Sequence, residues 1–237
     1  MAEPPPVKRF WNEVGVSEAE GGFHVTLDGR AIRTQGGAPQ IVPTRPLAEA
    51  LAEEWRAQGE EVDPRSFPMR DMADLAIDWM GPDRPAQVAN LLRYAETDTL
   101  CYRADPEEPL FRRQQDLWEP LVRAAEARHG LRFERVSGIV HRPQPDATLH
   151  ALRARLEQED DFTLAALATM VPLGASLIVA LAALDEDADP VRLFAAANCE
   201  EDWQAELWGT DAEAAEARSA REAAFVLAAR FAKLAQA

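Results

Sequence analysis

The chain has 237 residues, of which 47% are hydrophobic and 28% charged, and its formal net charge at pH 7 is −16. This length allows one large or two small folded domains, and the composition is typical of a globular rather than a disordered protein. The strong negative charge argues against a protein that binds nucleic acid or docks on an anionic bilayer, because both need clustered Lys and Arg. It favours a neutral or basic protein as the partner.

The first 45 residues indicate a small antiparallel β-sheet. Two short alternating segments, GFHVTL and AIRTQ, flank an Asp-Gly pair at residues 28 and 29. Asp-Gly between such segments is the strongest local signal for a two-residue hairpin turn. The segments WNEVGV and QIVP on either side are further candidate strands.

A helix that covers this sheet is expected next. Thr44 is a suitable N-cap, and Leu47, Leu51 and Trp55 fall on one helical face, which gives Trp55 a structural role. A short helix then runs to Gly81, where we place a domain boundary. The predicted units are an N-terminal α+β domain, residues 1–81, and a C-terminal helical domain, residues 82–237.

Nearly all of the second domain has helical periodicity. Stripes of apolar residues predict four of its helices: Val88, Leu91, Leu92 and Ala95; Leu110, Leu117, Trp118, Leu121 and Val122; Leu149, Leu152 and Leu156; and Ala224, Leu227, Phe231 and Leu234. The fold class is therefore α+β, with a small antiparallel β-rich domain and its covering helix followed by an all-α domain resembling an orthogonal bundle.

Residues 162–184 contain no charge, and this length is sufficient for a membrane span. Several Ala and Thr residues, Pro172 near the middle and acids at both ends argue against one. We expect a buried central helix, bent at Pro172, and no membrane insertion.

The acidic residues concentrate between residues 185 and 216, where eleven Asp or Glu accompany a single base, Arg192. Such a run is usually a solvated helix face. If residues 192–208 form one helix, Cys199, Trp203 and Leu207 share a face with Ala196, and Trp203 is a core residue. Glu201 and Trp208 lie on the opposite face, where an exposed tryptophan indicates a binding surface. The alternative is that Trp208 packs under a loop near Gly209.

Motifs for catalysis are absent: the sequence contains no GxxxxGK[ST], GxGxxG after a strand, GxSxG, HExxH or paired CxxC. The alternative that remains is a carboxylate-dependent metalloenzyme, which would use Glu96 and Asp98 with Glu200, Asp202 or Glu206 around a divalent ion. No His accompanies these acids at metal-ligand spacing, so we predict neither a metal site nor catalytic residues.

Five motifs, in this order and at these separations, resemble one family: FPMRDMADLAIDWM, LLRYAETDTLCYR, FRRQQDLWEPL, FTLAALATMVPLGASLIVALA and CEEDWQAELWG. The chain looks like an assembly chaperone for the alpha subunit of the F-type ATP synthase catalytic head, the family called ATP synthase assembly factor 2 in mitochondria. The resemblance spans nearly the whole chain. Two departures, Cys199 and the Pro172-Leu173-Gly174 turn, affect only the expected helix packing.

The resemblance implies transient binding of the newly made alpha subunit until the beta subunit joins, with no enzymatic activity and no cofactor. We expect partner contact at Glu201, Asp202, Glu206 and Trp208, and a monomeric protein. Two isolated cysteines fit a reducing compartment, and the N-terminus has no presequence pattern. We therefore expect a bacterial, cytoplasmic member, with the mitochondrial matrix as the location of eukaryotic relatives.

Overall fold

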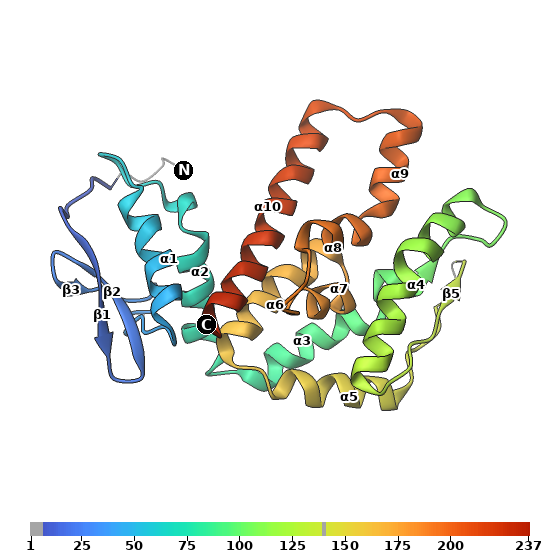
Figure 1. Ribbon diagram of the computed structural model, residues 1–237, viewed down its shortest axis with the longest axis horizontal. Helices are drawn as coiled ribbons and strands as arrows, with labels where there is room; N and C mark the ends of the chain where they lie inside the picture. The colour runs from blue at the N-terminus through green and yellow to red at the C-terminus, as the bar shows by residue number, and fades with distance from the viewer. Residues whose placement is uncertain (1–6, 139–140) are drawn as a thin grey trace, which may run out of the picture.

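The computed structural model describes residues 7–138 and 141–237. Figure 1 shows a small sheet with its covering helix, followed by a larger helical region. The elements up to residue 80 are β1 (Val14–Ala19), β2 (Gly22–Leu27), β3 (Arg30–Ala31), α1 (Arg45–Arg56), η1 (Pro64–Ser66), α2 (Pro68–Leu75) and the π-helix η2 (Ala76–Met80). Those that follow are α3 (Arg84–Glu96), η3 (Thr99–Cys101), β4 (Tyr102–Arg103), α4 (Pro109–His129), β5 (Val136–Ser137), α5 (Asp146–Glu157), α6 (Asp161–Gly174), α7 (Leu177–Ala182), α8 (Pro190–Ala197), α9 (Cys199–Trp208) and α10 (Ala212–Ala235).

The predicted hairpin closes at residues 28 and 29. Asp28 and Gly29 both have positive φ, at 48° and 78°, as a type I′ turn requires. Strand β2 pairs antiparallel with β1 in a register that places Val16 opposite Val25, and β3 pairs with the other edge of β2. The antiparallel sheet is therefore confirmed, but the QIVP segment adds only an isolated bridge at Val42 instead of a strand.

Helix α1 covers this sheet, as predicted (Figure 1). Thr44 caps it, because the Thr44 hydroxyl accepts a hydrogen bond from the Leu47 amide at 3.2 Å. Leu47 is fully buried. The ring of Trp55 lies between those of Trp11 and Phe67, with centroid separations of 5.1 and 4.6 Å. Trp55 thus packs the helix against both neighbouring segments.

Helix α6 is central to the helical region. Leu164, Leu167, Met170 and Val171 are all completely buried, and the helix packs against α2, η2, α3 and α10. Figure 1 shows α10 running beside α6 down to the C-terminus. A small sheet with a covering helix followed by a helical region confirms the predicted fold class, although two-residue strands β4 and β5 pair in parallel within that region.

The predicted domain boundary at residue 81 stays a prediction. Helices before it, α1 and α2, contact α10, and η2 contacts α6. The Thr44 hydroxyl also donates a hydrogen bond to the Leu234 carbonyl at 2.5 Å. The segments on either side of the boundary consequently share one continuous core.

The long apolar segment forms two helices, so the prediction of a single helix bent at Pro172 is wrong. Pro172 lies inside α6, and the break comes at Ala175, which has left-handed φ and ψ of 45° and 34°. Ser176 then caps α7 by accepting a hydrogen bond from the Val179 amide at 3.1 Å. The break is held from outside the segment, because the amide and hydroxyl of Thr99 both donate to the Ala175 carbonyl. Within the described residues, no helix is long and apolar enough to cross a membrane.

Candidate partner-binding site

Helix α9 and the first half of α10 stand out from the body of the molecule (Figure 1); we call residues 199–222 the α9–α10 arm. Asn198, with φ −100° and ψ 21°, separates α8 from α9, so the helical residues between 192 and 208 belong to two helices. Gly209, with φ 85°, ends α9. Asp211 then starts α10 by accepting a hydrogen bond from the Ala214 amide at 2.9 Å.

The end of α9 exposes two large apolar side chains. Trp208 is 74% exposed and Leu207 56% exposed. The sequence predicted that Cys199 and Leu207 lie on the same buried face. This is correct for Cys199, which is 1% exposed, but wrong for Leu207. Trp203, between them, is half-buried, and the Arg113 guanidinium lies 5.6 Å from its ring centroid. Burial decreases along α9 because the helix leaves the body after its first turn.

All three acids predicted to contact a partner are paired with arginines of this chain. Arg221 donates to both carboxylate oxygens of Glu201 at 2.7 and 2.5 Å, Arg218 to both of Asp202 at 3.1 and 3.0 Å, and Arg113 to both of Glu206 at 2.6 and 2.8 Å. The hydrogen bonds from Arg113 lower the pKa of Glu206. These pairs hold α9 to α10 on one side and to α4 on the other.

These pairings could not be predicted from the sequence; Arg113, for example, is 93 positions away from Glu206. The arm nevertheless keeps a large excess of negative charge. Between residues 200 and 222 there are eight acids and two arginines. The two arginines neutralise only a small part of this charge, so the electrostatic potential around the arm stays negative.

A groove of about 590 Å³ separates α9 from α10. Its walls carry Glu201, Asp202, Gln204, Ala205 and Trp208 from α9, and Ala214, Ala215, Arg218, Ser219 and Glu222 from α10. Small side chains form much of the α10 wall, so a bulky side chain of another molecule has room there. Of the residues selected from the sequence, Glu201, Asp202 and Trp208 thus line the same groove, whereas Glu206 lies outside its lining.

The residues of the metalloenzyme alternative lie in unrelated surroundings. Asp98 is completely buried and accepts hydrogen bonds from the Leu100 and Ile178 amides. Glu200 accepts one from the Gln114 amide group at 2.6 Å, which partly offsets the rise in the pKa of Glu200 caused by desolvation. Among residues 7–138 and 141–237, no group of three or more His, Cys, Asp or Glu is placed to hold a metal ion.

Comparison with known proteins identifies the family. The family model described as "ATP12 chaperone protein" matches residues 8–126, which is half of the chain. The chain belongs to the ATP12 chaperone family. The resemblance to ATP synthase assembly chaperones, predicted from the five motifs, is thereby confirmed.

This ATP12 family member is similar to the following relatives over most of its length. The crystal structure of Atp12 from Paracoccus denitrificans is 39% identical, with a TM-score of 0.90, covering 96% of this chain and 98% of that one. A D202K mutant of the Paracoccus protein gives the same identity and TM-score, covering 96% of this chain and 97% of that one. The mitochondrial protein atp12 of Schizosaccharomyces pombe is 26% identical over 218 residues, which are 87% of this chain and 75% of the relative.

Proposed function

We propose that this ATP12 chaperone binds the free alpha subunit of the F-type ATP synthase catalytic head and shields its assembly surface until the beta subunit joins. Subunit surfaces that assemble permanently are large and apolar, and they aggregate when unpaired. A chaperone for such a surface needs an exposed apolar contact that can be released later. It needs no catalytic residue and no cofactor, and we propose none.

The observation that carries the proposal is the exposed pair Leu207 and Trp208 at the end of a projecting helix. Tryptophan is enriched at the centres of protein interfaces, where its burial supplies much of the binding energy. We propose that Trp208 anchors the alpha subunit in the groove between α9 and α10, with Leu207 beside it.

Glu201, Asp202 and Glu206 are proposed as the acidic part of the same contact. Their arginine partners fix the position of α9, and the excess of acids around the groove attracts a basic partner surface. Because each carboxylate is already paired, the free energy of binding is expected to depend more on Trp208 than on any one acid. A Glu201→Lys, Trp208→Ala double variant that keeps wild-type affinity for the alpha subunit would remove this surface from the proposal.

The test is binding of alpha subunit, produced without beta subunit, to the tagged protein and its variants. Trp208→Ala is expected to weaken binding about thirtyfold, the effect of losing about 2 kcal/mol at a central interface tryptophan. Trp79→Ala is the matched control, because Trp79 is also exposed, at 63%, but lies on η2 away from the arm. Equal affinity of wild type and Trp208→Ala would exclude the anchor, and no binding by the wild type would exclude the alpha subunit as partner.

A further inference from the structure

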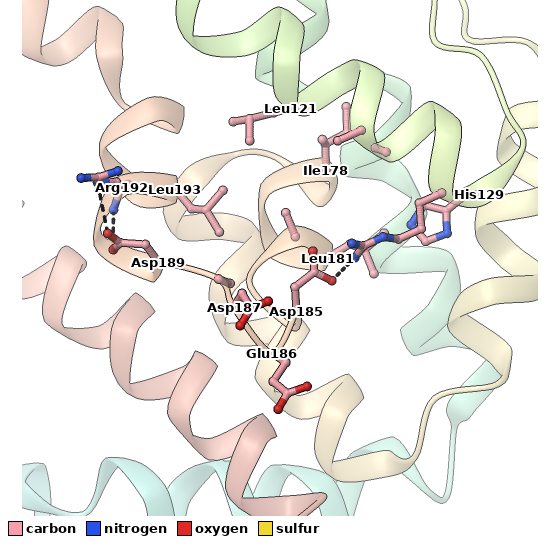
Figure 2. Close-up of a pocket in the computed structure, with 15 residues that line it drawn as sticks. Leu121, His129, Ile178, Leu181, Asp185, Glu186, Asp187, Asp189, Arg192 and Leu193 are labelled. Atoms are coloured by element: carbon pink, nitrogen blue, oxygen red, sulfur yellow. Dashed lines mark hydrogen bonds and ion pairs between the residues drawn. The ribbon is translucent and has the colours of Figure 1, made fainter.

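A second groove lies between α4, α7, α8 and the segment 183–189 that joins α7 to α8 (Figure 2). It has a volume of about 620 Å³ and shares no lining residue with the groove of the α9–α10 arm. Its apolar lining comes from Leu121, Ala124, Ala125, Ile178, Leu181, Ala182 and Leu193. These side chains form a floor that accepts a bulky apolar group.

The groove continues into a second hollow. This smaller hollow, of about 350 Å³, shares Arg128, His129, Leu181 and Asp185 with it. Two adjoining hollows with an apolar floor fit a chain segment, helical or extended, better than a compact small molecule.

The rim of this groove is acidic. Asp185, Glu186, Asp187 and Asp189 all line it, from a stretch of five residues. Asp185 is paired with Arg128. Asp189 is paired with Arg192, as Figure 2 shows. Among the residues that the structure describes, the carboxylates of Glu186 and Asp187 have no ion pair, so two negative charges remain at the rim.

Neighbouring bases in the described part of the chain form no ion pair with these two carboxylates. Desolvation, together with Arg155 and Arg128, lowers the pKa of His129, which disfavours a positive charge on its ring. The Lys233 ammonium donates to the main-chain carbonyl of Glu186 at 3.0 Å rather than to a carboxylate. An apolar floor under an uncompensated acidic rim is complementary to an apolar side chain flanked by cations.

We propose that this second groove binds a segment of the same client protein, one that presents a bulky apolar side chain flanked by Lys or Arg. The inference rests on the proposed function, because it takes the client to be the subunit that the α9–α10 arm binds. Two separate contacts on one client raise the overall affinity through effective concentration, and each can be weak enough to release when the next subunit arrives. The client is thus held at two places on the surface of the chaperone.

Filling the groove is the first arm of the test. Ala124→Trp places a large side chain at an exposed position of the groove lining, and Ala127→Trp places the same side chain at an exposed position of α4 outside it. Ala124→Trp is expected to weaken binding of the free alpha subunit at least about tenfold, while Ala127→Trp leaves it unchanged. Circular dichroism and urea unfolding check that both variants fold.

Reversing the rim charge is the second arm. Glu186→Lys with Asp187→Lys is compared with Glu60→Lys with Glu61→Lys, which changes the net charge equally at another exposed pair. Only the first double variant is expected to lower the association rate, and the difference is expected to shrink as salt is added. A loss that is equal in both double variants would overturn the assignment of the charge effect to this groove.

The third arm locates the client segment with overlapping twenty-residue peptides that cover the alpha subunit. We expect the peptides that bind the wild type but not Ala124→Trp to combine an aromatic or large aliphatic residue with flanking Lys or Arg. If the wild type binds the whole subunit and every groove variant binds it equally, the second groove is overturned while the proposed function stands. If the wild type does not bind the subunit, the proposed function fails first, and the inference fails with it.

Discussion

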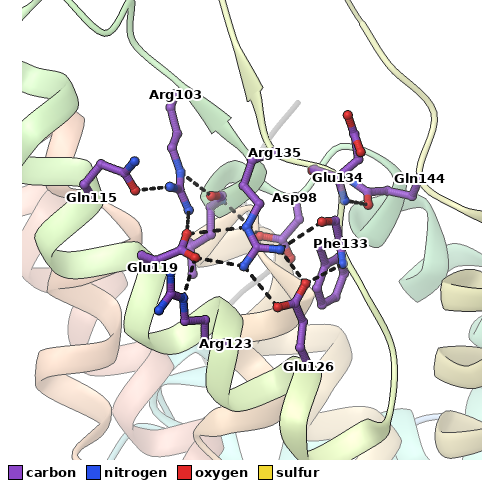
Figure 3. Close-up of polar contacts among 11 residues, drawn as sticks. Asp98, Arg103, Gln115, Glu119, Arg123, Glu126, Phe133, Glu134, Arg135 and Gln144 are labelled. Carbon is purple, nitrogen blue, oxygen red and sulfur yellow. Dashed lines mark hydrogen bonds and ion pairs between the residues drawn. The ribbon is translucent and has the colours of Figure 1, made fainter.

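Glu119 accepts hydrogen bonds from three arginines and joins β4 and the segment around β5 to α4 (Figure 3). Arg103 and Arg123 donate to it at 2.8 Å, and Arg135 at 3.1 Å. Desolvation alone would raise the pKa of Glu119, but the three guanidinium groups bring it down to about 2. The stability that this carboxylate contributes is therefore complete above its unfolded pKa of about 4.3 and is lost as the pH falls toward 2.

The pKa of Asp98 is shifted in the opposite direction. Its side chain is completely buried, and this desolvation raises the pKa of Asp98 to about 6 despite hydrogen bonds from the amides of Ile178 and Leu100. Between the unfolded pKa of about 3.9 and the folded value, the folded chain holds a proton that the unfolded chain has lost. The contribution of Asp98 to the free energy of unfolding consequently falls as the pH rises through this window.

Urea unfolding of wild type and Asp98→Asn between pH 4 and pH 7.5 tests this assignment. The wild type is expected to lose roughly 2 kcal/mol from Asp98 ionisation as the pH rises from 4 to 6, and only a few tenths of a kcal/mol more by pH 7.5. Asp98→Asn cannot ionise, so its free energy of unfolding lacks this component. A difference between the two proteins that is constant over the whole pH range would show that Asp98 has an ordinary pKa.

At the scale of single elements, the break between α6 and α7 depends on contacts from the α3–η3 connection. Asp98 accepts from the amide of Ile178, in the first turn of α7, and Thr99 donates to the carbonyl of Ala175. In this geometry Ala175 adopts a left-handed backbone conformation, which is strained for a residue with a Cβ. Because the Ala175 side chain is exposed, this strain lies in the backbone and does not involve core packing.

Ala175→Gly is expected to raise the free energy of unfolding by about 1 kcal/mol, because glycine adopts positive φ without a Cβ clash. Ala168→Gly, in the middle of α6, is the control and is expected to lower it by about 1 kcal/mol. Urea midpoints of the two variants measure both effects. Equal destabilisation by both glycines would show that the backbone at residue 175 carries no strain.

For the whole molecule, the projecting arm is held to the body by few contacts. Arg113, on α4, pairs with Glu206 and stacks on Trp203, and it is the link from α4 to the outer half of α9. A projecting element of this kind unfolds locally more easily than a core helix such as α6. Local opening of the arm leaves the core around α6 folded.

Hydrogen exchange of Arg113→Ala tests this link. Amides of α9 are expected to exchange about three to ten times faster, since the variant removes both the ion pair with Glu206 and the cation–π contact with Trp203. Amides of α6 should keep their wild-type rates. Arg65→Ala, which removes another exposed arginine paired with an acid, is expected to leave α9 unchanged. Faster exchange throughout the chain would instead mean that Arg113 stabilises the whole fold.

Local features were predictable from the sequence wherever the physical cause is local. The Asp-Gly turn, the Thr44 cap and the left-handed Gly130 at the end of α4 depend on a few neighbouring residues. The sequence placed Trp208 opposite the apolar face of its helix but left open whether it is exposed or packs under a loop near Gly209, and the structure shows it exposed. These features, with the family resemblance, also gave the fold class.

The sequence by itself determined the hairpin, the covering helix, the helical character of residues 84–235 and the family. Only the tertiary structure decided that the long apolar segment breaks at Ala175, that Leu207 is exposed, and that arginines pair with Glu201, Asp202 and Glu206. It also brought α4, α7 and α8 together around the second groove. Each of these depends on residues distant in sequence meeting in space, and helical periodicity carries no information about which distant helix supplies the neighbour.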